Sequence, residues 1–311
     1  MSAETGFIEA LRALATDPAS RALLDDAAVL EVAGATLVLT HDMLVEGVHY
    51  LAEDPPEEVA WKLVAVNLSD LAAKGAAPLG VLLGYALGEA SWDRAFGRGL
   101  GTALAAFDLP LLGGDTVAMP AGAPRALGMT AIGRAGASVP ARSGARPGDH
   151  LWVTGTIGDA GAGLDLLRNG RSEPAGLIER YRNPRPRLEA GQRLAPLAAA
   201  MMDVSDGLLI DARRMAQASG CLVEIELEDI PRSAELLALL DNPLAAATAG
   251  DDYELLFAAG PDAAPQLLAL AQEIGLPFSR IGRFEAGTGL ALTCSGKFVP
   301  LPPNLGYEHD R

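Results

Sequence analysis

Aspartates that interrupt apolar segments restrict the fold of this chain more than any other feature of its sequence. In "AAAMMDVSDGLLIDA", three carboxylates (Asp203, Asp206 and Asp211) stand among Ala, Met, Val and Leu, and the only nearby cations are Arg213 and Arg214. A carboxylate in apolar surroundings is costly unless a cation or several hydrogen-bond donors meet it. The fold must therefore bring partners for these acids from elsewhere in the chain.

Four other segments share this character, namely "LLDDAA", "LTHDMLVEG", "NLSDLAAKG" and "LLGGDTV". Each alone has an ordinary explanation, because Asp is common in turns before Gly and at helix caps. In the third segment, Asn67, Asp70 and Lys74 fall on one face of a helix expected over 55–75, so this line is either a solvated edge or one wall of a site. Together the segments favour a Mg²⁺ site, since Mg²⁺ prefers carboxylate oxygens and bridges to substrate phosphates.

Strands and helices alternate along the whole chain, which predicts a two-domain α/β (α+β) protein. We expect an amphipathic helix over 4–16 and a helix capped by Ser91 that runs to about Phe107. The segment "SVPARSGARPGD" is the best linker candidate, and the pattern restarts after it. We therefore predict domains at 1–137 (ATP- and Mg²⁺-binding, dimerisation) and 138–311 (C-terminal α/β).

The formal net charge of −16 argues against nucleic acid as a partner, because phosphate backbones need clustered Lys and Arg. An acidic protein can still hold ATP if divalent cations lie between the two. Neither a G-x-x-x-x-G-K-[ST] loop nor a G-x-G-x-x-G motif after a strand occurs. Any nucleotide site would therefore depend on dispersed aspartates and metal.

Compartment and membrane association are suggested by what the sequence lacks. Cys221 and Cys294 are far apart and without metal-ligand spacing, which predicts core thiols in a reducing compartment. The N-terminus has no signal architecture, and the longest uncharged stretch, "GAAPLGVLLGYALG", is too short to span a bilayer. We expect a cytoplasmic protein without membrane contact.

The motifs "DDAAVL", "THDMLVEGVHY", "AVNLSDLAAKGAAP", "LLGGDT", "RSGARPGD", "VTGTIGDAGAGL", "MDVSDGL" and "GDDYELLF" occur in this order. This series resembles the thiamine-monophosphate kinase family, within the superfamily of aminoimidazole ribonucleotide synthetase. The resemblance implies a two-domain fold in which the N-terminal sheets of two subunits form a shared barrel. A homodimer with the active site at the junction of the two domains is therefore expected.

The family phosphorylates thiamine phosphate to thiamine diphosphate with ATP as co-substrate and Mg²⁺, and we expect direct in-line transfer. The metal ligands that the resemblance implies are Asp26, Thr40, His41, Asp42, Asp70, Asp115, Asp203 and Asp206. Of these, it gives catalytic roles to Asp70 and Asp206. The implied nucleotide-binding residues are Gly114, Asp115, Arg142 and Ser205. The implied contacts to thiamine phosphate are His49, Asp251 and Tyr307.

Three departures from the family pattern bear on these roles. His41 stands where Thr is frequent, Asp251 stands where Glu is usual, and "LLDD" lacks the glycines that commonly precede the acid pair. On sequence alone Arg142 could equally be a solvated linker arginine, and Arg185 and Arg187 have no assigned role.

Two other readings of the sequence stay open. One is another ATP-dependent enzyme of the same superfamily with a different acceptor, as in aminoimidazole ribonucleotide synthetase or selenophosphate synthetase. Selenophosphate synthetase normally carries a reactive Cys near its N-terminus, and none occurs here before Cys221. The other is a non-catalytic protein that binds metal or nucleotide.

Overall fold

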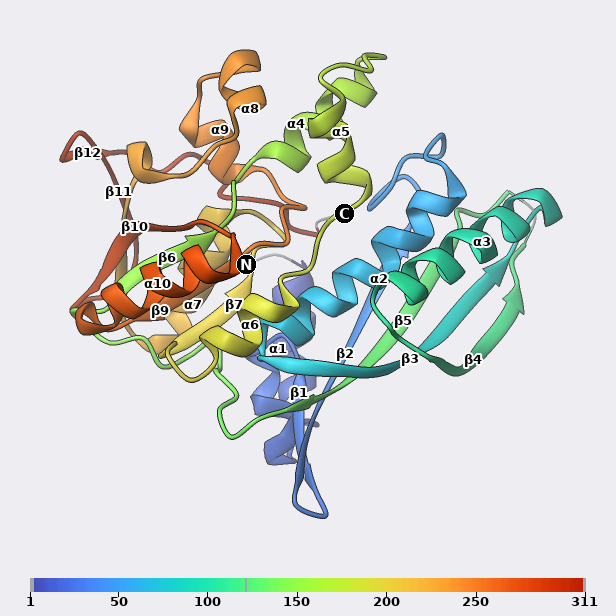
Figure 1. The fold of residues 1–311 in the computed structure, drawn as a ribbon, viewed down its shortest axis with the longest axis horizontal. Coiled ribbons are helices and arrows are strands. Elements are labelled where there is room, and N and C mark those ends of the chain that lie inside the picture. The colour runs from blue at the N-terminus through green and yellow to red at the C-terminus, as the bar shows by residue number, and fades with distance from the viewer. Residues whose placement is uncertain (1–2, 121, 310–311) are drawn as a thin grey trace.

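The computed structural model describes residues 3–120 and 122–309, which form two β-sheets with helices packed on them (Figure 1). The first, the N-terminal sheet, has five strands in the order β1-β2-β5-β3-β4. Its strands are β1 (Ala28–Val32), β2 (Ala35–Val45), β3 (Ala76–Leu87), β4 (Leu111–Ala118) and β5 (Ala126–Ala135). This arrangement agrees with the expected α/β class.

Local sequence explains the connections of this sheet. Strands β1 and β2 form an antiparallel hairpin closed by Ala33 and Gly34, which both have positive φ (50° and 82°). Two consecutive positive φ values are typical of the type I′ turn, whose twist matches that of paired strands. Strands β3 and β4 are parallel, so a crossover is needed, and α3 (Ala90–Ala106) provides it.

Two helices cover one face of the N-terminal sheet, α2 (Pro56–Ala73) and α3 (Figure 1). The expected cap at Ser91 is wrong, because α3 already begins at Ala90 and Glu89 is the capping position. The opening helix α1 spans Ala3–Arg12 and is therefore shorter than predicted. The adjoining 3₁₀ segment η1 covers Pro18–Leu23.

The N-terminal sheet and its loops leave many large apolar side chains uncovered in the single chain. Every residue of β4, an edge strand, is exposed. The exposed apolar side chains in this part of the chain are Val32, Met43, Val48, Leu79, Leu82, Leu87, Leu111, Leu112, Val117 and Met119. Of these, Met43, Leu82 and Val117 lie in register on the sheet face that α2 does not cover, and exposed apolar side chains gathered on one face mark an interaction surface more often than a solvated one.

The second sheet, the C-terminal sheet, has seven strands in the order β12-β11-β8-β10-β6-β9-β7. The strands are β6 (His150–Thr154), β7 (Ala200–Asp203), β8 (Leu222–Glu226), β9 (Leu255–Ala259), β10 (Phe278–Glu285), β11 (Gly289–Cys294) and β12 (Lys297–Val299). The helices are α4 (Asp159–Arg168), α5 (Ala175–Arg182), α6 (Leu188–Leu194), α7 (Leu208–Ser219), α8 (Ala234–Leu239), α9 (Pro243–Thr248) and α10 (Ala264–Ile274), with short 3₁₀ turns η2 (Leu227–Asp229) and η3 (Pro261–Ala263). Strand β9 is buried along its whole length, as its apolar sequence predicts.

Helix α2 also joins the two sheets, because its C-terminal half packs on α6 and β7. A Cβ atom at Gly191 would lie 2.0 Å from the carbonyl oxygen of Ala72, so only glycine allows this approach of α6 to α2. We propose the domain boundary between 137 and 138, in the segment that separates β5 from β6. Within the described residues, no helix is long and apolar enough to cross a membrane.

Candidate active site

A cavity of 1130 Å³ lies where the two sheets meet, and acids line its floor. They come from the segment before β1, from β2, from α2, from the end of β7 and from the turn before α7. Five of the six aspartates predicted as metal ligands line it, namely Asp26, Asp42, Asp70, Asp203 and Asp206. We call this the acidic cavity.

Helix α2 contributes Asp70, whose carboxylate accepts a hydrogen bond from the Thr40 hydroxyl. Burial, together with Asp42 and Asp203 nearby, raises the pKa of Asp70 well above its usual range. The pKa of Asp203 is also raised well above its usual range, mainly by burial, although the Ser69 hydroxyl donates to it at 2.6 Å. Other carboxylates thus raise the pKa of both residues, Asp203 among them for Asp70 and Asp26 among them for Asp203.

Strand β2 contributes Asp42, whose backbone N–H donates to Asn67 Oδ1 at 3.0 Å. Burial and the charges of Asp26 and Asp206 raise the pKa of Asp42 to about 6. Asn67 and Lys74 are fully buried and Asp70 nearly so. The polar line on α2 is therefore an interior wall and not a solvated edge.

Asp26 behaves in the opposite way because it has basic partners. Burial acts to raise its pKa, but Arg142 and Lys74 hold the pKa of this carboxyl well below its usual range. Lys74 Nζ lies 2.9 Å from Asp26, contacts Asp25 and donates to the carbonyl of Met201 at 3.1 Å. Arg142 is thus an ion-paired wall of the cavity and not a solvated linker residue.

The turn between β7 and α7 explains the segment "MDVSDGLLIDA". Asp211 Oδ2 accepts the backbone N–H groups of Ser205 and Asp206, both at 3.2 Å. Arg214 contacts both Asp206 and Asp211. Burial and Asp206 raise the pKa of Asp211 to about 7, although Arg214 opposes this shift. Asp211 therefore holds the turn, and Asp206 and Ser205 face the cavity.

The donor set of the acidic cavity fits a divalent cation. In the described part of the chain, no salt bridge reaches Asp42, Asp70 or Asp203. Hard cations such as Mg²⁺ bind carboxylate oxygens and offset this kind of repulsion. Basic side chains contact Asp25, Asp26, Asp206, Asp211 and Asp251, whereas Asp42, Asp70 and Asp203 have no ion pair within the described residues.

The residues predicted to contact thiamine phosphate line the same cavity. His49 Nδ1 accepts the backbone N–H of Val45 at 3.0 Å, and burial, then His309, lower the pKa of His49. The backbone N–H of Tyr307 donates to the carbonyl of Asp206 at 2.8 Å, which fixes the C-terminal segment beside the turn.

Four predicted residues do not line the acidic cavity: Thr40, His41, Gly114 and Asp115. Thr40 lies beneath Asp70, to which it donates. His41 is exposed, and its Nδ1 lies 2.8 Å from the hydroxyl oxygen of Thr130. Because neighbouring residues of a strand point to opposite faces, His41 and Asp42 cannot share a face of the sheet.

The strand register puts Asp115 on the face that α2 does not cover. Asp115 pairs with Gly84, Gly84 pairs with Gly128, and Gly128 pairs with Met43. Paired residues share a face, and Met43 follows Asp42, so Asp115 and Asp42 lie on opposite faces. Asp115 is therefore not brought to the cavity of its own chain, and Gly114 does not line that cavity either.

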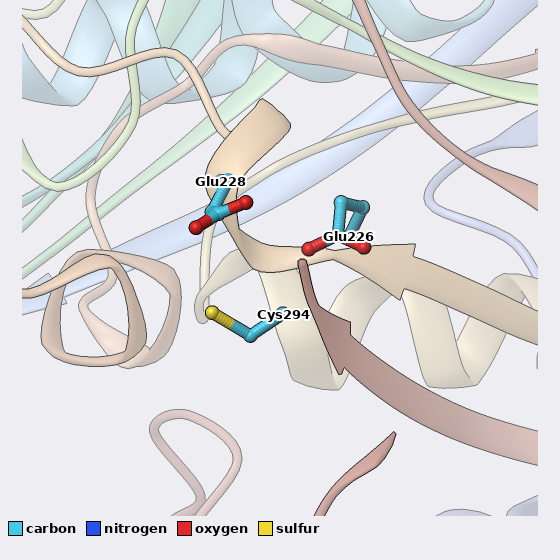
Figure 2. Close-up of side chains that lie close together, drawn as sticks. All are labelled: Glu226, Glu228 and Cys294. Carbon is cyan, nitrogen blue, oxygen red and sulfur yellow. The ribbon is translucent and has the colours of Figure 1, made fainter. Parts of the chain in front are cut away.

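A second group of possible metal ligands, Glu226, Glu228 and Cys294, has atoms within 4.8 Å of one another (Figure 2). The glutamates already accept hydrogen bonds from Ser295, and burial followed by both glutamates raises the pKa of the Cys294 thiol. This protonated thiol is a poor ligand.

Cys294 is only half-buried, so the expectation of two core thiols is right for Cys221 and wrong for Cys294.

Residues 24–135 match the family described as AIR synthase related protein, N-terminal domain, and residues 146–295 match its C-terminal domain. The two sheets and the acidic cavity between them are thus those of an AIR synthase-related protein.

Comparison with individual proteins narrows this class. A thiamine-monophosphate kinase of Caulobacter vibrioides is 42% identical over 308 residues, covering 94% of this chain and 86% of the relative. The structure of AaThiL complexed with AMPPCP and TMP superposes with a TM-score of 0.84 at 32% identity, covering 98% of this chain and 97% of that one. The thiamine-monophosphate kinase of Stenotrophomonas maltophilia K279a gives 0.78 at 36% identity, with 94% and 96% covered. The chain belongs to the thiamine-monophosphate kinase family.

Proposed function

We propose that this protein transfers the γ-phosphate of ATP to thiamine phosphate, giving thiamine diphosphate and ADP. The related AaThiL structure is complexed with AMPPCP and TMP, an ATP analogue and a ligand of the family's reaction. The observation that carries the proposal is the acidic cavity, in which five aspartates from both halves of the chain surround one space. The volume of 1130 Å³ exceeds that of most single-ligand pockets, so it can hold two substrates.

The aspartates of the acidic cavity would hold Mg²⁺. When bound, Mg²⁺ would supply positive charge that offsets the negative charge of the ATP phosphates beside these carboxylates. Arg142 offers a forked guanidinium at the same wall, suited to a phosphate oxygen. Ser205, Asp206 and the turn that Asp211 holds give this end of the cavity a fixed shape.

Direct in-line transfer, without a phosphoenzyme, is the mechanism we propose. The acceptor is a phosphate that is already an anion, so its oxygen needs no strong general base. His49 is consistent with this, since burial lowers its pKa and keeps the ring neutral near pH 7, so it adds no charge beside the acceptor. The work of the protein is then to position two anions and to exclude water.

The proposed Mg²⁺ dependence and the choice of acceptor are tested together. Purified protein with ATP, Mg²⁺ and thiamine phosphate should form thiamine diphosphate, and chelation of Mg²⁺ should abolish the product. Turnover of an aminoimidazole ribonucleotide precursor in place of thiamine phosphate would reject the assignment. Metal-dependent ATP binding without any turnover would favour a binding protein.

We further propose a homodimer in which the uncovered face of the N-terminal sheet meets that of a second copy. Two observations support it: the exposed apolar side chains on this part of the chain, and the position of Asp115 away from its own cavity. In a dimer, Asp115 of one subunit would serve the cavity of the other. Under this proposal Asp115 remains a metal ligand, in the cavity of the partner subunit.

Mixing two inactive variants tests this exchange. If Asp115 acts across the interface, a heterodimer of Asp70→Asn and Asp115→Asn has one site with both wild-type residues. Random exchange should then restore about a quarter of wild-type activity, because half of the dimers are mixed and each has one intact site. Mixed dimers without activity would indicate that both residues serve the same chain's site. Full activity of Asp115→Asn alone would remove it from the site.

A further inference from the structure

Lys62, on α2, is a buried cation that the mechanism above does not use. Lysine occurs at only three positions of the sequence, and the side chain of Lys62 is only 2% exposed. Its Nζ donates to the carbonyl of His49 at 3.0 Å and to Asp251 Oδ2 at 2.8 Å. The cation also lies over the ring of Tyr181, 4.0 Å from the centroid. A buried lysine with this complete set of partners has a defined position.

The two residues that Lys62 joins come from the two halves of the chain. His49 is 13 residues away in sequence and Asp251 is 189 residues away. Both line the acidic cavity, as Tyr307 does. Lys62 itself does not line the cavity, so it can influence a substrate only through these neighbours.

Asp251 depends on such support. Its φ is 70°, in the left-handed region that a non-glycine residue seldom adopts, and its backbone N–H donates to Ser205 at 2.7 Å. One carboxylate oxygen accepts from Tyr253 at 3.1 Å and the other faces Lys62. The side chain remains 26% exposed. The carboxylate is thus held at both oxygens while it keeps free lone pairs toward the cavity.

Hydrogen bonds to Asp54 in turn fix the position of the Tyr181 ring that Lys62 contacts. The hydroxyl of Tyr181 donates to Asp54 at 3.0 Å, and Arg182 Nε donates to the other oxygen of Asp54, also at 3.0 Å. The ring beneath Lys62 is therefore fixed by a buried carboxylate of the loop that follows His49.

We propose that Lys62 is a positioning residue for the acceptor substrate. It holds the Asp251 carboxylate and the His49 loop in one arrangement, in which Asp251 accepts a hydrogen bond from an amino group of the substrate. Asp251 is one methylene shorter than the Glu usual in this family, so its reach depends on where it is held. Asp251 contacts the nucleotide-binding candidate Ser205 only through its backbone N–H, so loss of the Lys62 ion pair acts on the Asp251 side chain rather than on Ser205 or Arg142. This inference rests on the proposed function.

The test is Lys62→Met, which keeps an unbranched side chain one atom shorter and removes the charge. We expect the KM for thiamine phosphate to rise about tenfold, with kcat and the KM for ATP within about twofold of wild type. Asp251→Asn should give a similar rise. The double variant Lys62→Met/Asp251→Asn should be no worse than Asp251→Asn, because residues that act as a unit are not additive.

Lys297→Met is the matched control. It makes the same substitution at an exposed lysine of β12 that does not line the cavity, and it should leave the KM for thiamine phosphate unchanged. Equal changes in both KM values, additive effects in the double variant, or an unchanged KM in Lys62→Met would overturn the proposal. If Lys62→Met does not fold, Lys62→Gln provides the same comparison with a neutral donor.

Failure of the inference can be distinguished from failure of the proposed function. If the wild-type protein forms no thiamine diphosphate, the function fails. Calorimetric binding of thiamine phosphate to wild type and Lys62→Met then still measures whether Lys62 matters to that ligand. Weaker binding by the variant supports the positioning role, and equal binding rejects it.

Discussion

At the scale of single residues, the buried acids separate into those with a protein cation and those without one. Asp26 has Arg142 and Lys74, and its pKa is lowered. Asp70 and Asp203 have no such partner, and their pKa values are raised. The difference identifies which carboxylates lack a protein cation and therefore depend most on a metal ion to offset their charge.

Asp70→Asn tests this division. Asparagine keeps an oxygen for the Thr40 hydroxyl and removes the charge, so we expect a folded protein with kcat reduced on the order of a thousandfold. Without metal, the variant should melt at a higher temperature than wild type, since one of several repelling carboxylates is gone. Product assays and thermal melting in chelator measure the two effects. Wild-type turnover by Asp70→Asn would contradict its role as a ligand.

His49 gives a pH-dependent prediction. Its folded pKa is lowered by burial and His309, with Asp251 and Asp206 opposing and Lys62 reinforcing the shift. The unfolded state therefore takes up a proton near pH 6.5 when the folded state does not, and stability falls as pH decreases below that value. His49→Asn keeps an acceptor for Val45 and does not titrate. The Tm of His49→Asn minus the Tm of wild type should therefore be larger at pH 5.5 than at pH 7.5.

His49→Gln is the control for geometry. Its amide is too far along the side chain to replace Nδ1 as acceptor for the Val45 N–H, so it should be less stable than His49→Asn at both pH values. A difference between wild type and His49→Asn that does not change with pH would show that the imidazole is not the titrating group.

At the scale of elements, α2 shows what sequence can and cannot provide. The spacing of Asn67, Asp70 and Lys74 predicted one polar face, and that face is buried, with Asp70 lining the cavity. The pattern could not say which acid Lys74 would meet, because Asp25 is 49 residues away and the choice depends on how β1 packs on α2. No pattern in the sequence indicated a role for Lys62, since its partner Asp251 comes from the other half of the chain.

The sequence of strand β2 was sufficient to predict that His41 points away from the cavity. Alternation along a strand already puts Thr40 and Asp42 on one face and His41 on the other. The position of Asp115 could not be found this way. It depends on the order of strands in the sheet and on an irregularity between Val81 and Leu82, neither of which local sequence encodes.

Helix α3 provides a matched pair of glycines two positions apart. A Cβ atom at Gly99 would lie 2.4 Å from the backbone of Glu57 on α2, whereas one at Gly101 would meet nothing within 4 Å. Gly99→Ala should therefore cost about 1–3 kcal/mol of unfolding free energy through overpacking. Gly101→Ala should add about 0.5–1 kcal/mol because alanine favours the helix. Denaturant titration of both variants measures the difference, and equal effects would contradict the close contact of α2 and α3.

At the scale of the whole molecule, two properties oppose each other. A net charge of −16 repels a second copy, and the uncovered apolar side chains of the N-terminal sheet attract one. The sequence predicted the charge directly but not the uncovered face, because apolar strand residues read the same whether a helix or another subunit covers them. If the apolar face is the interface, added salt should strengthen association by screening the charge.

Leu82→Asp tests the proposed interface. Leu82 is 39% exposed and pairs with Thr130 and Gly113, on the same face as His41. A carboxylate there would be desolvated without a partner in a dimer and hydrated in a monomer. Light scattering should therefore give a dimer for wild type and a monomer for Leu82→Asp. Leu268→Asp, on α10 and 50% exposed, is the control and should remain dimeric. A dimeric Leu82→Asp protein would mean that the copies meet through another surface, and Asp115 would then need a different explanation.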